Sequence, residues 1–218
     1  HGVAADGHGH VLVADTRNHR VQKIGPDGQP AGAWGSEGSG EGRLRDPQAL
    51  AVDGQGNMYI ADTGNHRVVK LGPDGRPLAS WGGPGTQPGQ LNSPAGIAAD
   101  AAGNVYVADT LNNRIQKLGS DGRPIGQWGG FGTAPGAFNH PTALALDAAG
   151  NLYVVDSLNQ RVQKLAPDGR SLAEWRSDPN GAITFRQPVG LAVDGQGNLF
   201  VLDGESGSIW MLPAGQGG

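Results

Sequence analysis

The chain contains no cysteine, so disulfide bonds, thiolate chemistry and cysteine-ligated zinc are excluded. Only 17% of its 218 residues are charged, and the formal net charge is -4 at pH 7. Because this balance gives no global basic field, nucleic acid is a disfavoured partner. No apolar run approaches the roughly 18 residues of a membrane-spanning helix, so we expect no membrane insertion by this segment. No signal-peptide pattern opens the chain.

Glycine and proline are abundant instead, with 39 and 15 residues. Together they approach the level at which low-complexity disorder must be considered. Regularly spaced apolar runs argue against disorder, and the length is sufficient to bury a sizeable core. The composition therefore predicts short strands joined by many tight turns.

A repeat of 47 residues organises the chain. Aspartates and tryptophans recur at this spacing without insertions: Asp15, Asp62, Asp109, Asp156 and Asp203, and Trp34, Trp81, Trp128 and Trp175. The repeat predicts one domain made of five units, with approximate boundaries at 1–47, 48–94, 95–141, 142–188 and 189–218. The last unit is incomplete.

Each unit is predicted to contain four short strands. In the second unit they are expected at residues 50–52, 58–61, 68–71 and 78–81. The second strand, Met-Tyr-Ile-Ala, is apolar on both faces, as a strand between two other sheets would be. Asp53 to Asn57 and Pro73 to Gly75 have the composition of tight turns. No segment has a helical period, so we expect an all-β fold, a β-propeller of four-stranded antiparallel blades.

The residues from Leu50 to Leu71, LAVDGQGNMYIADTGNHRVVKL, resemble the NHL repeat, and similar text recurs at 96–118 and 143–165. The resemblance implies a propeller that commonly has six blades. Five are visible here, so we expect the chain to be part of a six-bladed ring. The fifth unit departs from the pattern because the segment after Asp203 lacks the Asn and Arg, and no tryptophan-bearing outer strand follows Leu212.

An Asp-x-x-Asn-x-Arg motif follows the second strand of four units. Carboxylates recurring in this way could indicate a metal or catalytic site. A motif present in every complete blade is better explained as a buried, hydrogen-bonded brace of the loop after that strand. The predicted brace residues are Asp15, Asn18, Arg20, Asp62, Asn65, Arg67, Asp109, Asn112, Arg114, Asp156, Asn159 and Arg161.

Two other activities stay open as alternatives. The resemblance extends to zinc-dependent lyases, in which His1 would match one ligand, but three or four converging ligands are needed. A lactonase-like enzyme would need acidic residues unique to single blades. Some related propellers bind RNA, and here a local basic patch could be formed by Arg17, Arg43, Arg45, His19 and His66. We predict no catalytic residue, no metal ligand and no cofactor.

The favoured function is non-catalytic: a scaffold or recognition domain for a protein, peptide or glycan. Positions that vary between repeats are free to specialise, and they flank the repeated proline and lie in the loop between the second and third strands. In a propeller these positions emerge on one face. The predicted binding face contains Arg17, His19, Asp46, Gln48, His66, Ser93, Asn113, His140, Thr142, Gln160 and Gln187. The resemblance implies a secreted or extracytoplasmic bacterial protein.

Overall fold

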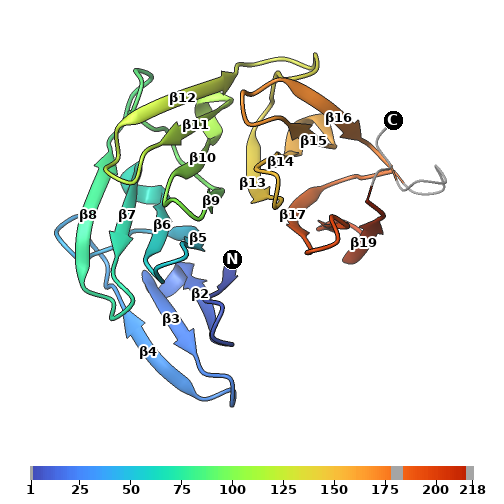
Figure 1. The fold of residues 1–218 in the computed structure, drawn as a ribbon. Coiled ribbons are helices and arrows are strands. Elements are labelled where there is room, and N and C mark those ends of the chain that lie inside the picture. Colours follow the sequence, from blue (N-terminus) through green and yellow to red (C-terminus); the bar gives the residue numbers. More distant parts are fainter. Residues whose placement is uncertain (1, 178–183, 215–218) are drawn as a thin grey trace. The chain divides into compact units, whose positions relative to one another are not determined.

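The computed structural model describes residues 2–177 and 184–214 (Figure 1). Within them every regular element is a β-strand, apart from four short 3-10 segments. The strands form five antiparallel sheets, or blades, each made of strands that are consecutive in sequence. The chain divides into two compact units, the first with His1–Asp109 and Gln116–Gly126, the second with Thr110–Ile115 and Gln127–Gly218.

Blades 1 and 2 have four strands each. They are β1 (Val3–Ala5), β2 (Val11–Asp15), β3 (Arg20–Ile24) and β4 (Pro30–Trp34), and β5 (Pro47–Val52), β6 (Met58–Asp62), β7 (Arg67–Leu71) and β8 (Pro77–Gly82). Blade 3 consists of β9 (Ile97–Ala99), β10 (Val105–Asp109), β11 (Arg114–Leu118) and β12 (Pro124–Gly129). Blade 4 has β13 (Pro141–Leu146), β14 (Leu152–Asp156), β15 (Arg161–Leu165) and β16 (Ser171–Trp175). In the described residues blade 5 has three strands, β17 (Pro188–Val193), β18 (Leu199–Asp203) and β19 (Ser208–Leu212).

This architecture confirms the predicted propeller of four-stranded antiparallel blades; the fifth blade has three strands in the residues that the structure describes. In blade 2, for which the four strand ranges were predicted, the largest difference lies at the first strand. The strand expected at 50–52 begins at Pro47, because Pro47 pairs with Asp62 across a bulge before Ala49. The 3-10 segments η1 (Thr16–Asn18), η2 (Thr63–Asn65), η3 (Thr110–Asn112) and η4 (Ser157–Asn159) were not predicted. They fill the loop between the second and third strands.

The turns between the first and second strands depend on an aspartate. Asp53 Oδ1 accepts the backbone N–H groups of Gln55 and Asn57, both at 2.9 Å. Its Oδ2 accepts Asn57 Nδ2 at 2.8 Å and the Tyr59 hydroxyl at 2.9 Å. Gly56 supplies the positive φ of 81° that closes the turn. The predicted turn is confirmed, and its carboxylate also anchors the following strand.

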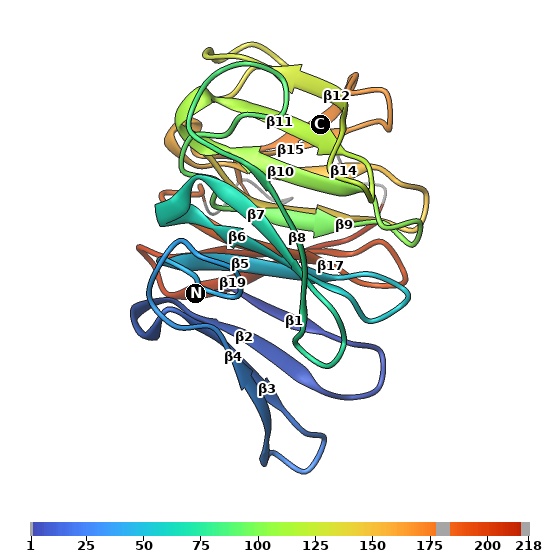
Figure 2. The same cartoon turned by 90° about the vertical axis from the view of Figure 1, so that its left-hand side faces the viewer.

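In the first unit, inner strands of successive blades pack on one another. The strand β5 contacts β1 and β2, and β9 contacts β5 and β6 (Figure 2). All five residues of β6 are buried. Its side chains alternate between two hydrophobic cores. Met58 and Ile60 belong to the core shared with blade 1, and Tyr59 and Ala61 belong to the core shared with blade 3. The strand is therefore apolar on both faces for the predicted reason.

The second unit repeats this packing between blades 4 and 5. The strand β17 contacts β13 and β14. Tyr153, Val155 and Val162 form a core with Leu199 and Val201. No helix in the described part of the chain has the length and apolarity to cross a membrane.

The outer-strand tryptophans pack against a glycine of the next blade. A Cβ added to Gly75 would overlap the indole of Trp34, and one added to Gly122 would overlap Trp81. In the second unit, Gly169 has the same relation to Trp128, whose Nε1 donates to the Asp168 carbonyl at 2.8 Å. These glycines thus have two constraints, a positive φ of 82° to 88° and an indole ring at the position of a side chain.

Candidate functional site

The repeated Asp-x-x-Asn-x-Arg motif forms a dense hydrogen-bond cluster in blade 4. The Arg161 side chain has 0% exposure, and its Nε donates to Asp156 Oδ2 at 2.7 Å. Its Nη1 donates to Glu174 Oε2 at 2.7 Å. The remaining contacts are with carbonyl oxygens of the loop before the blade: Thr133 at 2.8 Å, Ala134 at 3.0 Å and Ala137 at 2.8 Å. One guanidinium therefore forms hydrogen bonds with the end of β14, with the outer strand β16 and with the loop before β13.

Blade 2 has the same cluster in the first unit. Arg67 Nε donates to Asp62 Oδ2 at 2.7 Å, and Asn65 Nδ2 donates to the same oxygen at 2.8 Å. The Arg67 guanidinium also binds loop carbonyls, those of Ser39 at 2.7 Å, Gly40 at 3.3 Å and Arg43 at 2.8 Å. Asp62 Oδ1 accepts the Arg45 N–H at 2.6 Å. The motif thus holds the loop that enters the blade, a role that was not part of the prediction.

The motif residues of blades 1 and 3 also make side-chain contacts. In blade 1 Arg20 Nε donates to Asp15 Oδ2 at 2.8 Å, and Asn18 Nδ2 donates to both Asp15 oxygens. In blade 3 Asp109 Oδ1 accepts the Asn92 N–H at 2.6 Å. The Arg114 guanidinium donates to Gln127 Oε1 at 2.8 Å, and Asn112 lies in η3.

Sequence reasoning missed two residue types that extend these clusters. Gln116 and Gln163 each donate to the motif carboxylate at 3.1 Å and accept a loop N–H at 2.8 Å. The hydroxyls of Thr16 and Thr63 donate to the carbonyls of Pro47 and Pro94 in the next blade, both at 2.6 Å. Glutamine recurs in three units, at Gln22, Gln116 and Gln163, and threonine in three, at Thr16, Thr63 and Thr110. This recurrence at multiples of 47 residues was the available signal.

The two predicted sets of binding-face residues come together in pairs in the first unit. We call residues 16–19, 63–66, 110–113 and 157–160 the tip loops. His19 Nδ1 in one tip loop accepts the Asp46 N–H at 3.1 Å, and His66 Nδ1 in the next accepts the Ser93 N–H at 3.0 Å. The two residues of each pair are 27 positions apart in the sequence, and their hydrogen bond joins a tip loop to the entrance of the following blade. All four residues have a positive φ.

The second unit repeats the arrangement with different side chains. Asn113 Oδ1 accepts the His140 N–H at 2.8 Å, and Gln160 Nε2 donates to the Arg186 carbonyl at 3.1 Å. Gln187 is exposed beside Arg186, while Thr142 is half-buried on β13. In the first unit, Gln48 is half-buried on β5. His1 lies outside the described residues.

The position at the tip of each loop changes chemistry from blade to blade. It is Arg17 in blade 1, Gly64 in blade 2, Leu111 in blade 3, Leu158 in blade 4 and Glu205 in blade 5. Leu111 and Leu158 are 50% and 63% exposed, although leucine is usually buried. In the second unit the tip loops therefore present apolar side chains on a backbone fixed by hydrogen bonds.

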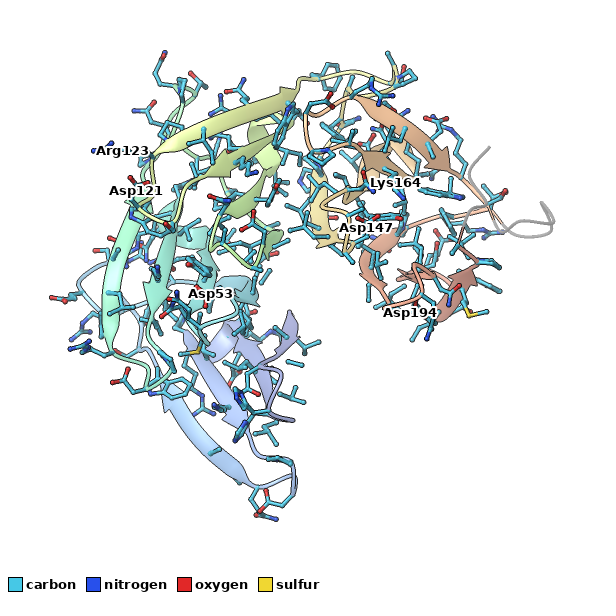
Figure 3. The ribbon with its side chains drawn as sticks, viewed as in Figure 1. Asp53, Asp121, Arg123, Asp147, Lys164 and Asp194 are labelled. Atoms are coloured by element: carbon cyan, nitrogen blue, oxygen red, sulfur yellow. The ribbon has the colours of Figure 1, made fainter. Side chains whose placement is uncertain are left out.

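The opposite ends of the strands hold the turn aspartates, labelled in Figure 3. Burial alone would raise the pKa of Asp53, but hydrogen bonds from Asn57, Gln55 and Tyr59 outweigh it and lower the pKa. Burial likewise opposes the lowering of the Asp147 pKa by Asn151 and by Lys164, whose Nζ lies 3.2 Å from Asp147 Oδ2. In the described residues no group of three or more His, Cys, Asp or Glu side chains is placed to hold a metal ion.

We expect the protein to lose stability in acid because of these turns. A carboxyl group whose pKa is lower in the folded state stabilises the fold above its unfolded pKa of about 4, and this contribution disappears as the pH falls through the folded value. Chemical denaturation between pH 7 and pH 2 measures the loss. Replacement of both carboxyls, Asp53→Asn with Asp147→Asn, should flatten the pH dependence; an unchanged slope would contradict this prediction.

Together the blades, the inter-blade cores and the repeated loops define a β-propeller. The family model of the NHL repeat matches the chain four times, over residues 1–24, 44–71, 91–118 and 138–165. The chain belongs to the NHL-repeat family, as its sequence resemblance predicted. A search of characterised protein sequences gives no match.

Solved structures of propellers are similar to this chain. A streptogramin B lyase has a TM-score of 0.70 at 18% identity, and the match covers 99% of this chain and 68% of that chain. A nidogen/laminin complex gives a TM-score of 0.74 at 22% identity, covering 97% and 74%. A catalytically inactive virginiamycin B lyase from Staphylococcus aureus with quinupristin gives 0.69 at 15%, covering 99% and 70%. At these identities the likeness shows the fold alone.

Proposed function

We propose that this chain is a single-domain recognition module that binds a protein or peptide through its tip loops and the adjoining blade entrances. The observation that carries the proposal is the pairing of tip loops with blade entrances. His19 and His66 in one unit, and Asn113 in the other, each accept a backbone N–H from the following blade entrance. This pairing provides a rigid frame for side chains that differ between blades, and loops on a rigid scaffold are common recognition sites.

The chemistry of the tips favours a protein or peptide over a glycan or nucleic acid. Leu111 and Leu158 project from the second unit, and Val189 is exposed at the start of blade 5. Exposed apolar patches with a polar rim mark surfaces that bind other proteins, and these three side chains would supply the apolar part of such a patch. Gln160 and Gln187 are the exposed polar neighbours here. Of the two solved propeller types above, the nidogen/laminin complex is an example of a protein-bound propeller.

Paired substitution of the exposed leucines, Leu111→Asp with Leu158→Asp, tests this proposal. Peptides selected from a random displayed library on the unaltered protein would serve as probes, and a glycan array would be screened in parallel. We expect the pair to weaken peptide binding at least about tenfold, because two apolar anchors at the centre of a contact contribute over 1 kcal/mol. The thermal midpoint should stay unchanged, since both side chains are solvent-exposed.

Exposed glutamines of the opposite turns provide the matched control, Gln55→Asp with Gln196→Asp. These residues lie in turns between first and second strands. Their substitution should leave binding intact. If substitution of the glutamine pair abolished binding while substitution of the leucine pair did not, the binding surface would be formed by the turns between the first and second strands. Selection of glycans alone would assign the module to a different class of ligand.

A further inference from the structure

Blades 2 and 5 have an arginine at the same repeat position, two residues before their first strands. Across blades 2 to 5 the residues at this position are Arg45, Asn92, Asn139 and Arg186. Each arginine is anchored by its backbone N–H, which donates to the buried, repeated aspartate of its own blade. For Arg45 the acceptor is Asp62 Oδ1 at 2.6 Å, and for Arg186 it is Asp203 Oδ2 at 2.8 Å. The two arginines therefore occupy equivalent places in their blades.

In blade 5 the chain itself supplies a carboxylate to this arginine. Glu205 occupies the tip position of the blade, and its Oε1 lies 3.1 Å from Arg186 Nη1. Both side chains stay exposed, at 70% for the arginine and 55% for the glutamate. This pair shows where a carboxylate lies when an arginine at a blade entrance binds one.

Blade 2 has the arginine without the acid, because its tip position is Gly64. Arg45 is exposed, and within the described residues its guanidinium forms no hydrogen bond and no ion pair. The neighbouring acid, Asp46, lies beside a different group, with its Oδ1 3.7 Å from His19 Nδ1. Arg45 is thus an exposed cation at the position where blade 5 has an ion pair.

The tip loop of blade 2 holds the stem of Arg45 in place. A Cβ added to Gly64 would lie 2.6 Å from Arg45 Cγ and 3.0 Å from its Cδ, so the arginine stem occupies the space of a side chain at the tip. The Gly64 N–H also donates to the Arg45 carbonyl at 2.9 Å. With the bond to Asp62, the backbone is fixed on both sides of the arginine side chain. A side chain held in this way loses less conformational freedom when it binds a ligand.

We propose that the Arg45 guanidinium binds an aspartate or glutamate side chain of the partner, in the place that Glu205 takes beside Arg186. The inference rests on the proposed function, because it names a chemical feature of the peptide that the tip loops bind. A guanidinium presents a planar pair of donors that matches a carboxylate. The net charge of -4 gives no general attraction for anions, so this recognition is local to Arg45.

A double-mutant cycle between the protein and peptides selected from a random displayed library tests the proposal. We expect the peptides to share an acidic residue at one position, and Arg45→Gln to weaken their binding at least about tenfold. Replacement of the shared acid by its amide should weaken binding to the same extent. Arg45→Gln should then have no further effect, because the contact is already lost.

Arg76→Gln is the matched control. Arg76 is also exposed and forms no ion pair within the part of the chain that the structure describes. It lies in the turn between β7 and β8, at the end of these strands away from the tip loop. This variant should leave peptide affinity unchanged. Equal losses of affinity in Arg45→Gln and Arg76→Gln would overturn the proposal, because they would show a general effect of charge.

A second measurement does not depend on the library. Acetylated tetraglutamate amide would be titrated into the protein labelled with nitrogen-15, and the side-chain Nε–H signals of the arginines would be followed by NMR. We expect the Arg45 signal to reach half of its shift at a probe concentration at least about fivefold lower than the Arg76 signal. The same midpoint for both signals would overturn the proposal.

The outcomes separate this inference from the proposed function. Peptides that require Leu111 and Leu158, contain no shared acid and bind equally well to Arg45→Gln would overturn the inference and leave the recognition function in place. If the library gives no binding peptide, the proposed function fails, and the NMR titration alone decides the Arg45 site. Binding of oligouridine that Arg45→Gln weakens, without a response to tetraglutamate, would assign Arg45 to phosphate and overturn the proposal.

Discussion

Arg161→Ala should lower the free energy of unfolding by about 3–5 kcal/mol, as is typical when one partner of a buried ion pair is removed. The variant leaves the fully buried Asp156 carboxylate without its guanidinium. It also removes donors from the carbonyls of Thr133, Ala134 and Ala137, which are organised by this one side chain. Urea denaturation followed by circular dichroism measures the change.

Arg20→Ala is the matched control, because it removes the same residue at the same repeat position in blade 1. Its side chain is 40% exposed, so solvent screens its pair with Asp15 and the expected loss is about 1 kcal/mol or less. Equal losses at Arg20 and Arg161 would mean that the loop carbonyls contribute little. Loss of peptide binding by Arg161→Ala at full stability would instead make the motif part of the binding surface.

Gly75→Ala should destabilise the protein by about 2–5 kcal/mol. Two effects add at this position. A non-glycine residue at a φ of 82° costs about 1–2 kcal/mol, and overpacking against a packed neighbour costs about 1–3 kcal/mol. The neighbour is the indole of Trp34, which is partly buried and packs against the core between blades 1 and 2.

Gly28→Ala separates the backbone cost from the overpacking cost. Gly28 has a φ of 78°, and no atom of the described residues lies within 4 Å of the position of a Cβ, so only the backbone cost of about 1–2 kcal/mol is expected. The difference between the variants measures the contact of tryptophan with glycine, by thermal or urea denaturation. If Gly75→Ala and Gly28→Ala were equivalent, the indole would not constrain the turn.

The sequence predicted the fold because its signals are local and repeated. Turn chemistry at Asp53 to Asn57 and a short apolar strand at Met58 to Ala61 identify a hairpin without knowledge of the rest of the chain. Recurrence at 47 residues then identifies the blade and the family. The strand starts were less predictable, because β5 begins at Pro47 through pairing with Asp62 across a bulge.

Contacts among the predicted binding-face residues were partly predictable for the same reason. Variation between repeats identified His19, Asp46, His66 and Ser93, and the structure brings them together as pairs. The variation between repeats did not reveal that the histidine rings accept backbone N–H groups. That contact joins residues 27 positions apart, and a sequence pattern does not encode the direction of a ring nitrogen. The exposed leucines at the tips stand out only when burial is known.

By itself the sequence determined the repeat, the strands, the turns and the identity of each motif residue, because periodicity and turn propensity act within a few residues. Only the tertiary structure decided what each motif residue does. Arg20 and Arg161 occupy the same repeat position in the same motif, yet one side chain is 40% exposed and the other 0%. The difference arises from the loop that enters blade 4 and surrounds Arg161 with carbonyl groups. Contacts between neighbouring blades, rather than the motif itself, set its environment and its energy.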